Sequence, residues 1–293
     1  MNLIQLDQRR QRSIARPAQV CGVGYLTGAE VSLTFQPAPE NTGVVFVRTD
    51  LPGGPRITAH LDNVTDTKRR TTLGRAPVQV ALVEHVLAAL AGMRIDNCFV
   101  EVNAPEAPGL DGSAQAFVEA LQHAGTVLQD AARPIFGVAQ PVTATAPGAS
   151  VAFHPGPADE FRISYFLDYG LTSPIGRHSH TQVVTPESFA NELAECRTFV
   201  LESEALEFRR QGIGSRTTTA DLLVIGAHGP INNRFRRANE PARHKTLDVV
   251  GDQALLGADL RGHVVAYRSG HPLNIALLRA LTQTVRHGQR LAA

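Results

Sequence analysis

The chain has 293 residues, of which 43% are hydrophobic and 19% are charged, and 28 basic residues nearly balance 27 acidic ones. This length accommodates one large domain or two medium ones with a substantial core. The formal charge of +1 excludes bulk nucleic-acid binding and an acidic tail as organising features. Three widely spaced cysteines fit a reducing compartment and argue against a cysteine zinc site. Because there is neither a secretory signal nor a run of roughly 18 to 20 apolar residues, we expect a cytoplasmic protein with at most peripheral membrane contact.

The first part of the chain alternates strand patterns with two helical patterns. Residues 18–75 contain short strand patterns separated by turn signals, and we interpret the basic cluster at 68–70 as a solvated face. Residues 78–93 predict a helix that is apolar nearly all round and therefore buried, with two adjacent polar residues in it. A strand at 95–102 and a second helix at about 114–125 follow.

The second part of the chain begins with strands again. The pattern breaks just after residue 128, and we predict one half over residues 1–130 and another over residues 131–293. A loop is expected at 170–180, and Thr185 followed by proline predicts a capped helix start. Residues 202–211 predict a polar helix.

The two halves resemble each other in their order of elements. His85 begins H-V-L-A-A-L-A-G-M, which is followed by a strand, a D-G-S loop and a helix. His244 begins H-K-T-L-D-V-V-G-D, which is followed by a strand, an R-S-G-H loop and a helix at almost the same spacing. This degenerate duplication predicts an α+β fold of two sheet-plus-helix halves packed face to face, with the two histidines at equivalent points. A site is expected where the halves meet.

Residues 243–252, R-H-K-T-L-D-V-V-G-D, carry a row of ionisable groups on an otherwise apolar helix. His244 and Asp248 are four residues apart, which stacks them on one face, and Asp252 lies one turn further along. Two side chains that can bind a metal and are aimed at one point form half of a metal site. The HxxxD pattern is short and common, however, and a surface pair that stabilises a helix is the alternative.

Together with His85, this pair offers two nitrogen ligands and one oxygen ligand. Three protein ligands leave a fourth position for water, as in catalytic rather than structural zinc sites. A metal held there lowers the pKa of its bound water to about 7, and the adjacent Glu84 is placed to act as general base. The chain lacks the HExxH helix of the standard metalloproteases, so that class is disfavoured.

Four further residues are candidates for catalytic roles. His271 follows a glycine at the mouth of a strand-to-helix loop, where it could protonate a leaving amine or stabilise an oxyanion. Asp252 could fix its tautomer, and Lys245 and Thr198 could stabilise the developing oxyanion. Each of the four also has an ordinary structural reading, since single Thr, Lys and His residues are common without function.

At these residues the chain resembles the zinc-dependent UDP-3-O-acyl-N-acetylglucosamine deacetylases, the LpxC family of lipid A biosynthesis. The resemblance covers nearly the whole chain. The ordered motifs that carry it are G-V-G, Q-P-A-P-E-N-T-G, R-T-D, V-E-H, I-D-N, E-V-N-A-P-E, L-D-G-S-A, R-T-F, R-H-K-x-L-D-x-x-G-D and S-G-H-x-L-N.

The resemblance implies a role for each candidate. The implied zinc ligands are His85, His244 and Asp248. Glu84 would be the general base, His271 the general acid or oxyanion partner, and Asp252 the residue that orients it. Thr198 would hydrogen-bond the oxyanion, and Lys245 would position the substrate. The implied fold is a β-α-α-β sandwich, in which the helices lie between the sheets and an insert in the second half forms an apolar passage for the acyl chain.

The sequence departs from the family pattern at several positions that contact the substrate. The family's G-L-H-T-G becomes G-Y-L-T-G at residues 24–28, so its histidine is absent. The Gly-Gly-Ser turn of the insert becomes S-R-T-T at residues 215–218, whose bulk and charge would narrow or reroute the passage. Leu201 replaces an expected aromatic residue, and His178 and His180 are expected in an exposed loop.

The leading hypothesis is therefore a zinc-dependent hydrolase that deacetylates UDP-3-O-acyl-N-acetylglucosamine, with Fe²⁺ as an alternative metal. A paralogous deacetylase of another N-acetylated sugar nucleotide and a non-catalytic binding protein on the same scaffold are the alternatives. We expect an acylated UDP-amino-sugar as ligand, no nucleic-acid partner and a monomer.

Overall fold

The computed structural model describes the chain over residues 3–157 and 159–289, with side chains described up to residue 282. Within these ranges the chain folds as the predicted mixture of helices and strands. Among the described residues, none of the helices has both the length and the apolarity that crossing a bilayer requires.

The first main sheet is antiparallel except at its centre. Its strands lie in the order β2 (Ala18–Val23), β3 (Glu30–Pro37), β9 (Cys98–Val102), β4 (Val44–Arg48) and β5 (Arg56–Thr58). Strand β9 pairs antiparallel with β3 and parallel with β4. Alternate residues of β3, namely Val31, Leu33 and Phe35, are buried, so one face of this sheet is covered. Helix α2 (Gln115–Ala124) contributes to that cover, since Phe117 packs edge-on against Phe35.

The second main sheet repeats this topology. Its strands lie in the order β11 (Val142–Ala146), β12 (Ala149–His154), β19 (Gly262–Tyr267), β13 (Phe161–Asp168) and β14 (Arg177–Val183). Strand β19 pairs antiparallel with β12 and parallel with β13, as β9 does with its neighbours. In both sheets the central strand comes between two helices in the sequence: β9 between α1 (Glu84–Gly92) and α2, and β19 between α5 (Glu240–Ala254) and α6 (His271–Gln289). The predicted similarity of the two halves is therefore confirmed.

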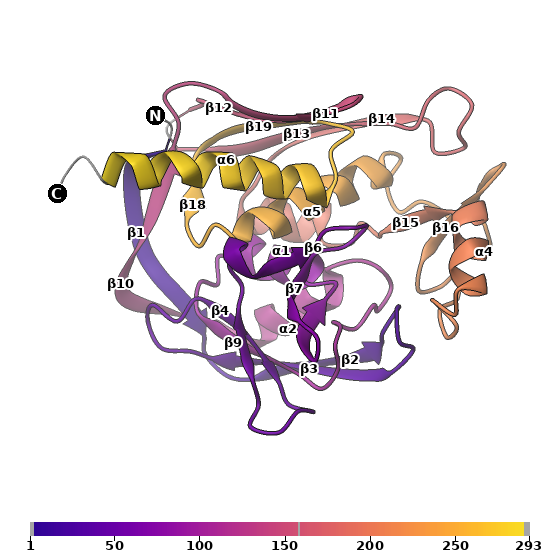
Figure 1. Cartoon of the computed structure of the whole chain (residues 1–293), viewed down its shortest axis with the longest axis horizontal. Coiled ribbons are helices and arrows are strands. Elements are labelled where there is room, and N and C mark those ends of the chain that lie inside the picture. Colours follow the sequence, from indigo (N-terminus) through magenta and orange to yellow (C-terminus); the bar gives the residue numbers. More distant parts are fainter. Residues whose placement is uncertain (1–2, 158, 290–293) are drawn as a thin grey trace.

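Helices α1, α2, α5 and α6 lie between the two main sheets, which form the outer layers (Figure 1). The predicted β-α-α-β sandwich is thus confirmed. Helices α1 and α5 cross at Gly251, where an added Cβ would lie only 2.1 Å from the carbonyl oxygen of Glu84. Only glycine allows the two backbones to approach this closely, and the contact brings the first turn of α1 against the helix that carries His244 and Asp248.

Three small sheets and further helices complete the described chain. One sheet pairs β1 (Ile4–Ile14), β10 (Thr126–Gly137) and β18 (Asp259–Leu260), and it runs between the two main layers at one side of the molecule (Figure 1). The others pair β6 (Val64–Asp66), β7 (Thr72–Arg75) and β8 (Val78–Ala81), and β15 (Phe199–Leu201), β16 (Leu223–Gly226) and β17 (Gly229–Pro230). The remaining helices are α3 (Pro186–Ser188), α4 (Glu202–Arg210), a 3-10 turn (Leu61–Asn63) and a π turn (Phe189–Leu193). Strand β10 covers the segment in which the sequence places the boundary between halves, and the division at residue 130 stays a prediction.

Two local predictions are wrong. The helix predicted from residue 78 begins only at Glu84, because 78–81 pair with β7 as strand β8 and Leu82 adopts a left-handed backbone with φ of 57°. The β-branched residues in V-Q-V-A favour the strand. The predicted exposed loop around His178 and His180 is instead strand β14, in which both side chains are half-buried. The capped helix start is confirmed, since the Thr185 side chain accepts a hydrogen bond from the Ser188 amide.

A network of arginines and aspartates links the small sheet of β1, β10 and β18 to the first half. Both terminal nitrogens of Arg9 donate to Asp96, at 2.7 and 2.8 Å, and its Nε donates to Asp259 at 2.7 Å. Arg133 also donates to Asp259, at 3.1 Å. Although burial opposes it, the hydrogen bond and charge of Arg9 and the charge of Arg133 lower the pKa of Asp259. A carboxylate with a lowered pKa stabilises the folded state above its unfolded pKa of about 3.9, and this contribution is lost as the pH falls through the folded value.

We expect Asp259→Asn to lower the free energy of unfolding by about 1–3 kcal/mol at pH 7, because two arginines lose a charged partner. The difference from the parent protein should shrink as the pH falls from about 4 through the lowered pKa of the native carboxyl, which is then itself neutralised. Urea denaturation between pH 7 and pH 3 measures this difference in the free energy of unfolding. Asp130→Asn is the control, because Asp130 pairs with Arg10 at 2.7 Å but is fully exposed, and its loss should change stability by about 0.5 kcal/mol or less. Equal effects of the two substitutions at pH 7 would contradict the prediction.

Candidate metal centre and active site

The three candidate ligands meet at the crossing of α1 and α5. His85 lies in the first turn of α1, and His244 and Asp248 lie one turn apart on α5. All three are buried, and one ligand atom from each lies within 4.8 Å of the others. The Oδ1 atom of Asp248 is 3.4 Å from Nε2 of His244 and 3.7 Å from Nε2 of His85. The two imidazole rings stand nearly perpendicular, with centroids 5.0 Å apart.

The donor atoms of this cluster fit a divalent cation. Oδ1 of Asp248 is buried and accepts no hydrogen bond among the described residues. Nδ1 of His244 lies 3.0 Å from the carbonyl oxygen of Cys196, which can only accept, so the proton sits on Nδ1 and the Nε2 lone pair faces the cluster. Burial and the neighbouring His244 lower the pKa of His85 to about 3, so this imidazole is neutral at pH 7. Two neutral imidazole nitrogens and one carboxylate oxygen suit zinc or iron.

Lys245 neutralises the other oxygen of the aspartate. Its Nζ donates to Oδ2 of Asp248 at 2.6 Å. Although burial opposes it, the adjacent His244 imidazole and the ammonium of Lys245 hold the pKa of Asp248 well below its usual range. The aspartate is therefore ionised, with Oδ2 bound to the ammonium and Oδ1 directed at the two histidines.

Glu84 and His271 face each other beside the cluster. Nε2 of His271 lies 3.9 Å from Oε1 of Glu84 and 3.8 Å from Oδ2 of Asp248. Burial raises the pKa of Glu84 to about 7, with the nearby charge of Asp248 acting in the same direction and that of His271 opposing it. Although burial opposes it, the charge and hydrogen bond of Asp252 raise the pKa of His271 to about 9. The pair thus combines a carboxylate whose pKa lies near neutral pH with a cationic imidazole. Such a pair can accept one proton, on the carboxylate, and donate another, from the imidazole.

Asp252 orients His271 from the side away from the cluster. Oδ2 of Asp252 lies 2.8 Å from Nδ1 of His271 and also accepts a hydrogen bond from Nδ2 of Asn274 at 2.8 Å. The carboxylate holds the proton of His271 on Nδ1, so Nε2 is the atom directed at Glu84.

Thr71 links these two pairs, although no sequence pattern identifies it. Its backbone amide donates to Oε2 of Glu84 at 2.9 Å, and its hydroxyl donates to Oδ1 of Asp252 at 2.7 Å. The side chain is fully buried. No motif marks this position, because Thr71 lies in a polar β-like segment 13 residues before Glu84. Asn274, by contrast, is the last residue of the S-G-H-x-L-N motif, so the sequence offers a signal for it.

A cavity of about 320 Å³ opens beside Glu84 and His85. Thr198 and Phe199 line it near these residues, and its far walls are largely apolar. The apolar wall residues are Leu206, Phe208, Ile213, Leu222, Val224 and Ile231. The backbone amide of Thr198 donates to the carbonyl oxygen of Gly112 at 2.7 Å, which fixes the strand end that carries it. The structure therefore brings Thr198 to the edge of the site.

Two sequence interpretations change at this cavity. Arg69 and Arg70, which we interpret from the sequence as a solvated face, line the cavity, and Arg69 pairs with Glu204 at 2.7 Å and lies over the ring of Phe208. Of the segment 215–218, which is expected to narrow or reroute the passage, Thr217 and Thr218 line the cavity but Arg216 does not. Its guanidinium donates to the carbonyl oxygen of Gly28 at 3.0 Å instead, so its charge faces away from the passage.

We expect Thr71→Val to lower the free energy of unfolding by about 1–3 kcal/mol, since the buried Asp252 carboxylate then loses a hydrogen bond without loss of volume. Because Asp252 also binds Nδ1 of His271, the ¹⁵N shifts of that ring should change as well. Thr71→Ser keeps the hydroxyl and should retain the native ring shifts and most of the stability. Denaturation and NMR of ¹⁵N-labelled histidine measure the two effects. If Thr71→Val leaves the His271 shifts as they are in Thr71→Ser, the hydroxyl has no orienting role.

Comparison with known proteins finds relatives that match most of this chain. The family model for LpxC, UDP-3-O-acyl N-acetylglycosamine deacetylase, matches residues 11–283. The chain is 42% identical over 273 residues to the UDP-3-O-acyl-N-acetylglucosamine deacetylase of Thermosynechococcus vestitus, covering 93% of this chain and 94% of that protein. It is 39% identical over 279 residues to the enzyme of the same name from Chlamydia caviae, covering 95% of this chain and 99% of that protein.

A third relative is longer than this chain. The bifunctional enzyme LpxC/FabZ of Chlorobaculum tepidum is 39% identical over 298 residues, which cover 92% of this chain but only 64% of that protein. The predicted enzyme class is confirmed, because a family match over most of the chain identifies it as a hydrolase that acts as a deacetylase. The chain belongs to the LpxC family of UDP-3-O-acyl N-acetylglycosamine deacetylases.

Proposed function

We propose that this protein removes the acetyl group from UDP-3-O-acyl-N-acetylglucosamine, the step for which its relatives are named and which the family resemblance assigns to lipid A biosynthesis. The observation that carries the proposal is the convergence of two neutral imidazoles and one carboxylate, with an unpaired Oδ1 on Asp248, next to the Glu84–His271 pair. The apolar cavity that opens at Glu84 and His85 supports a substrate with an acyl chain rather than an unacylated sugar nucleotide.

His85, His244 and Asp248 would hold the metal, for which we propose Zn²⁺, with Fe²⁺ as the alternative. A cation bound there would act as a Lewis acid that acidifies a water molecule and polarises the acetamide carbonyl. Lys245 keeps the ligand oxygen of Asp248 deprotonated and directed inward by occupying the second oxygen.

Glu84 is proposed as the general base. Its carboxylate lies at the edge of the cavity, and one oxygen is held by the Thr71 amide while the other faces His271. A pKa near 7 allows the group to accept a proton from an attacking water at neutral pH and to release it afterwards. The water oxygen bonds to the acetamide carbon as Glu84 takes the proton.

His271 is proposed as the general acid. Because Nδ1 is held by Asp252, the proton available to the substrate is the one on Nε2, which faces the site. Its transfer to the substrate nitrogen as the C–N bond breaks yields acetate and a free amine. Thr198, at the edge of the cavity, is proposed to donate its hydroxyl to the oxyanion, and Lys245 to help position the substrate.

Metal removal tests the proposed ligand set. We expect purified protein to contain one equivalent of zinc or iron, and a chelator to abolish acetate release until metal is restored. His244→Ala should lose the metal, because it removes one of three protein ligands. His123→Ala, on the exposed face of α2, is the control and should keep it. Elemental analysis of both variants decides the matter, and an unchanged metal content in His244→Ala would contradict the assignment.

We expect Glu84→Gln and His271→Ala each to lower kcat for acetate release by about 10²- to 10⁴-fold while metal content stays normal, because both remove a proton-transfer group and neither removes a ligand. The measurement is acetate release from UDP-3-O-acyl-N-acetylglucosamine. Glu119→Gln on α2 is the matched control and should retain full activity. A parallel assay on UDP-N-acetylglucosamine without the acyl chain should give a much lower kcat/KM. Full activity in both active-site variants would exclude the proposed roles, and equal kcat/KM on the two substrates would exclude the acyl specificity.

A further inference from the structure

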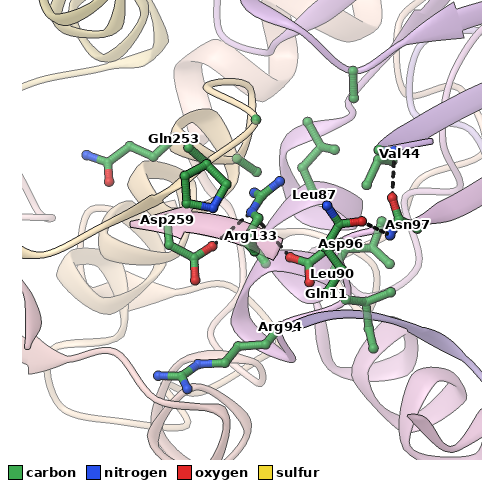
Figure 2. Close-up of a pocket in the computed structure, with 18 of the residues that line it drawn as sticks. Gln11, Val44, Leu87, Leu90, Arg94, Asp96, Asn97, Arg133, Gln253 and Asp259 are labelled. Carbon is green, nitrogen blue, oxygen red and sulfur yellow. Dashed lines mark hydrogen bonds and ion pairs between the residues drawn. The ribbon is translucent and has the colours of Figure 1, made fainter. Parts of the chain in front are cut away.

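A second cavity, of about 410 Å³, lies at the other end of the helix pair that carries the candidate metal ligands. Figure 2 shows it between the α1 residues Leu87 and Leu90 and the segment around Gln253 at the end of α5. Within the described chain it shares no lining residue with the cavity beside Glu84. Its size falls in the range of small-molecule sites, which is about 300–1,000 Å³.

The walls of this cavity differ in character from floor to rim. Leu87, Leu90 and Val250 form an apolar floor from both helices. The rim carries the ion-pair network in which Arg9 and Arg133 are bound to Asp96 and Asp259. An apolar floor with a few polar groups at the rim is typical of a site for a small molecule that has an apolar body and a charged end.

Arg94 is the cation at this rim that lacks an anionic partner. Its guanidinium makes neither an ion pair nor a hydrogen bond with the described residues, and in Figure 2 it extends separately from the group of Arg133, Asp96 and Asp259. Partial burial and repulsion from Arg9, Arg12 and Arg261 lower the pKa of Arg94, against the opposing charge of Asp259. The cavity lining holds three arginines and two aspartates, so its charge is positive and an anion would balance it.

The backbone at Arg94 is also unusual. Its φ is 57°, in the left-handed region just after the end of α1, where glycine is the favoured residue. An arginine therefore occupies a position at which glycine would be less strained.

Gln253 supplies a second unsatisfied group. The residue is only 7% exposed, lines the cavity, and has an Oε1 atom that accepts no hydrogen bond among the described residues. A buried acceptor without a donor is unfavourable, and a ligand with a hydroxyl or amide would satisfy it. This observation is independent of the charge at the rim, because Gln253 is neutral.

We propose that this cavity binds a small organic anion that has an apolar body, a carboxylate or phosphate recognised by Arg94, and a hydrogen-bond donor for Gln253. Such an occupant contacts the C-terminal ends of both α1 and α5, the helices whose other turns carry His85 and His244. The proposal does not rest on the deacetylase assignment, since the two cavities are lined by different residues.

The test uses the full chain with its metal and four probes: hexanoate, hexyl phosphate, hexanol and inorganic phosphate. Methyl-labelled NMR follows Leu87, Leu90 and Val250, and calorimetry gives Kd. We expect hexanoate or hexyl phosphate to shift these methyl groups saturably and to bind at least tenfold more tightly than hexanol or inorganic phosphate. The tighter of the two anionic probes identifies the head group.

Arg94→Gly is the decisive variant, because glycine suits the left-handed backbone and should not impair folding. This substitution should raise the Kd of the anionic probe at least tenfold, since a charge-assisted interaction is lost. Arg268→Gly is the matched control: Arg268 is also an exposed arginine with left-handed φ, of 52°, but does not line the cavity. It should bind the probe as the parent protein does.

Gln253→Leu tests the second contact. Among monohydroxyhexanoates, at least one should bind the parent protein several-fold more tightly than hexanoate and lose that advantage in Gln253→Leu. The proposal is overturned if methyl shifts are confined to residues of the deacetylase cavity such as Leu222, if no probe binds saturably, or if Arg94→Gly and Arg268→Gly bind the probe equally. An advantage that survives in Gln253→Leu overturns the assigned donor contact.

Discussion

The close crossing of α1 and α5 at Gly251 is the contact on which the candidate site depends. The carbonyl of Glu84 occupies the space that any larger residue at 251 would need. Without this approach, one candidate ligand from the first half and two from the second could not converge, because each half covers its own sheet with its own helices. The glycine in R-H-K-x-L-D-x-x-G-D is therefore required by packing between halves rather than by a turn.

The crossing also brings several ionisable side chains into a buried space, which is unfavourable unless each is paired or neutral. The two ligand histidines remain neutral, and Lys245 neutralises Asp248. Asp252 is held by Thr71, Asn274 and His271. The exception is Oδ1 of Asp248, left without a hydrogen bond at the point that both imidazoles face. A buried carboxylate oxygen left unpaired where two imidazoles converge fits a metal ligand better than a member of a structural ion-pair network.

Much of this arrangement could be predicted from the sequence, for a physical reason. Residues one turn apart on a helix, such as His244 and Asp248, must share a face, and ordered motifs identify partners far along the chain, such as His85. Thr71 could not be predicted, because its contacts with Glu84 and Asp252 arise from tertiary packing of a strand end and have no local periodicity.

The two errors in secondary structure have a related cause. The apolar run from residue 78 fits a buried strand and a buried helix equally well over its first turn, and only pairing with β7 decides between them. In the same way, polar residues around His178 suggested a loop, although the segment completes the edge of a sheet through pairing with β13. Non-local hydrogen bonds outweigh local propensity in both places.

The repeated topology explains why the site is asymmetric although the scaffold is not. In each half a helix, the central strand and a second helix follow one another, so α1 corresponds to α5 and α2 to α6. Helix α6 begins with His271, which points at Glu84, whereas α2 begins with Gln115, which pairs with Glu119 on its own exposed face. With the proposed roles, the second half would supply the general acid and two metal ligands, and the first half would supply the general base and one ligand. A duplicated fold gives equivalent places for side chains, and catalysis requires only that complementary ones meet at the shared interface, so each copy is free to keep a different part of the chemistry.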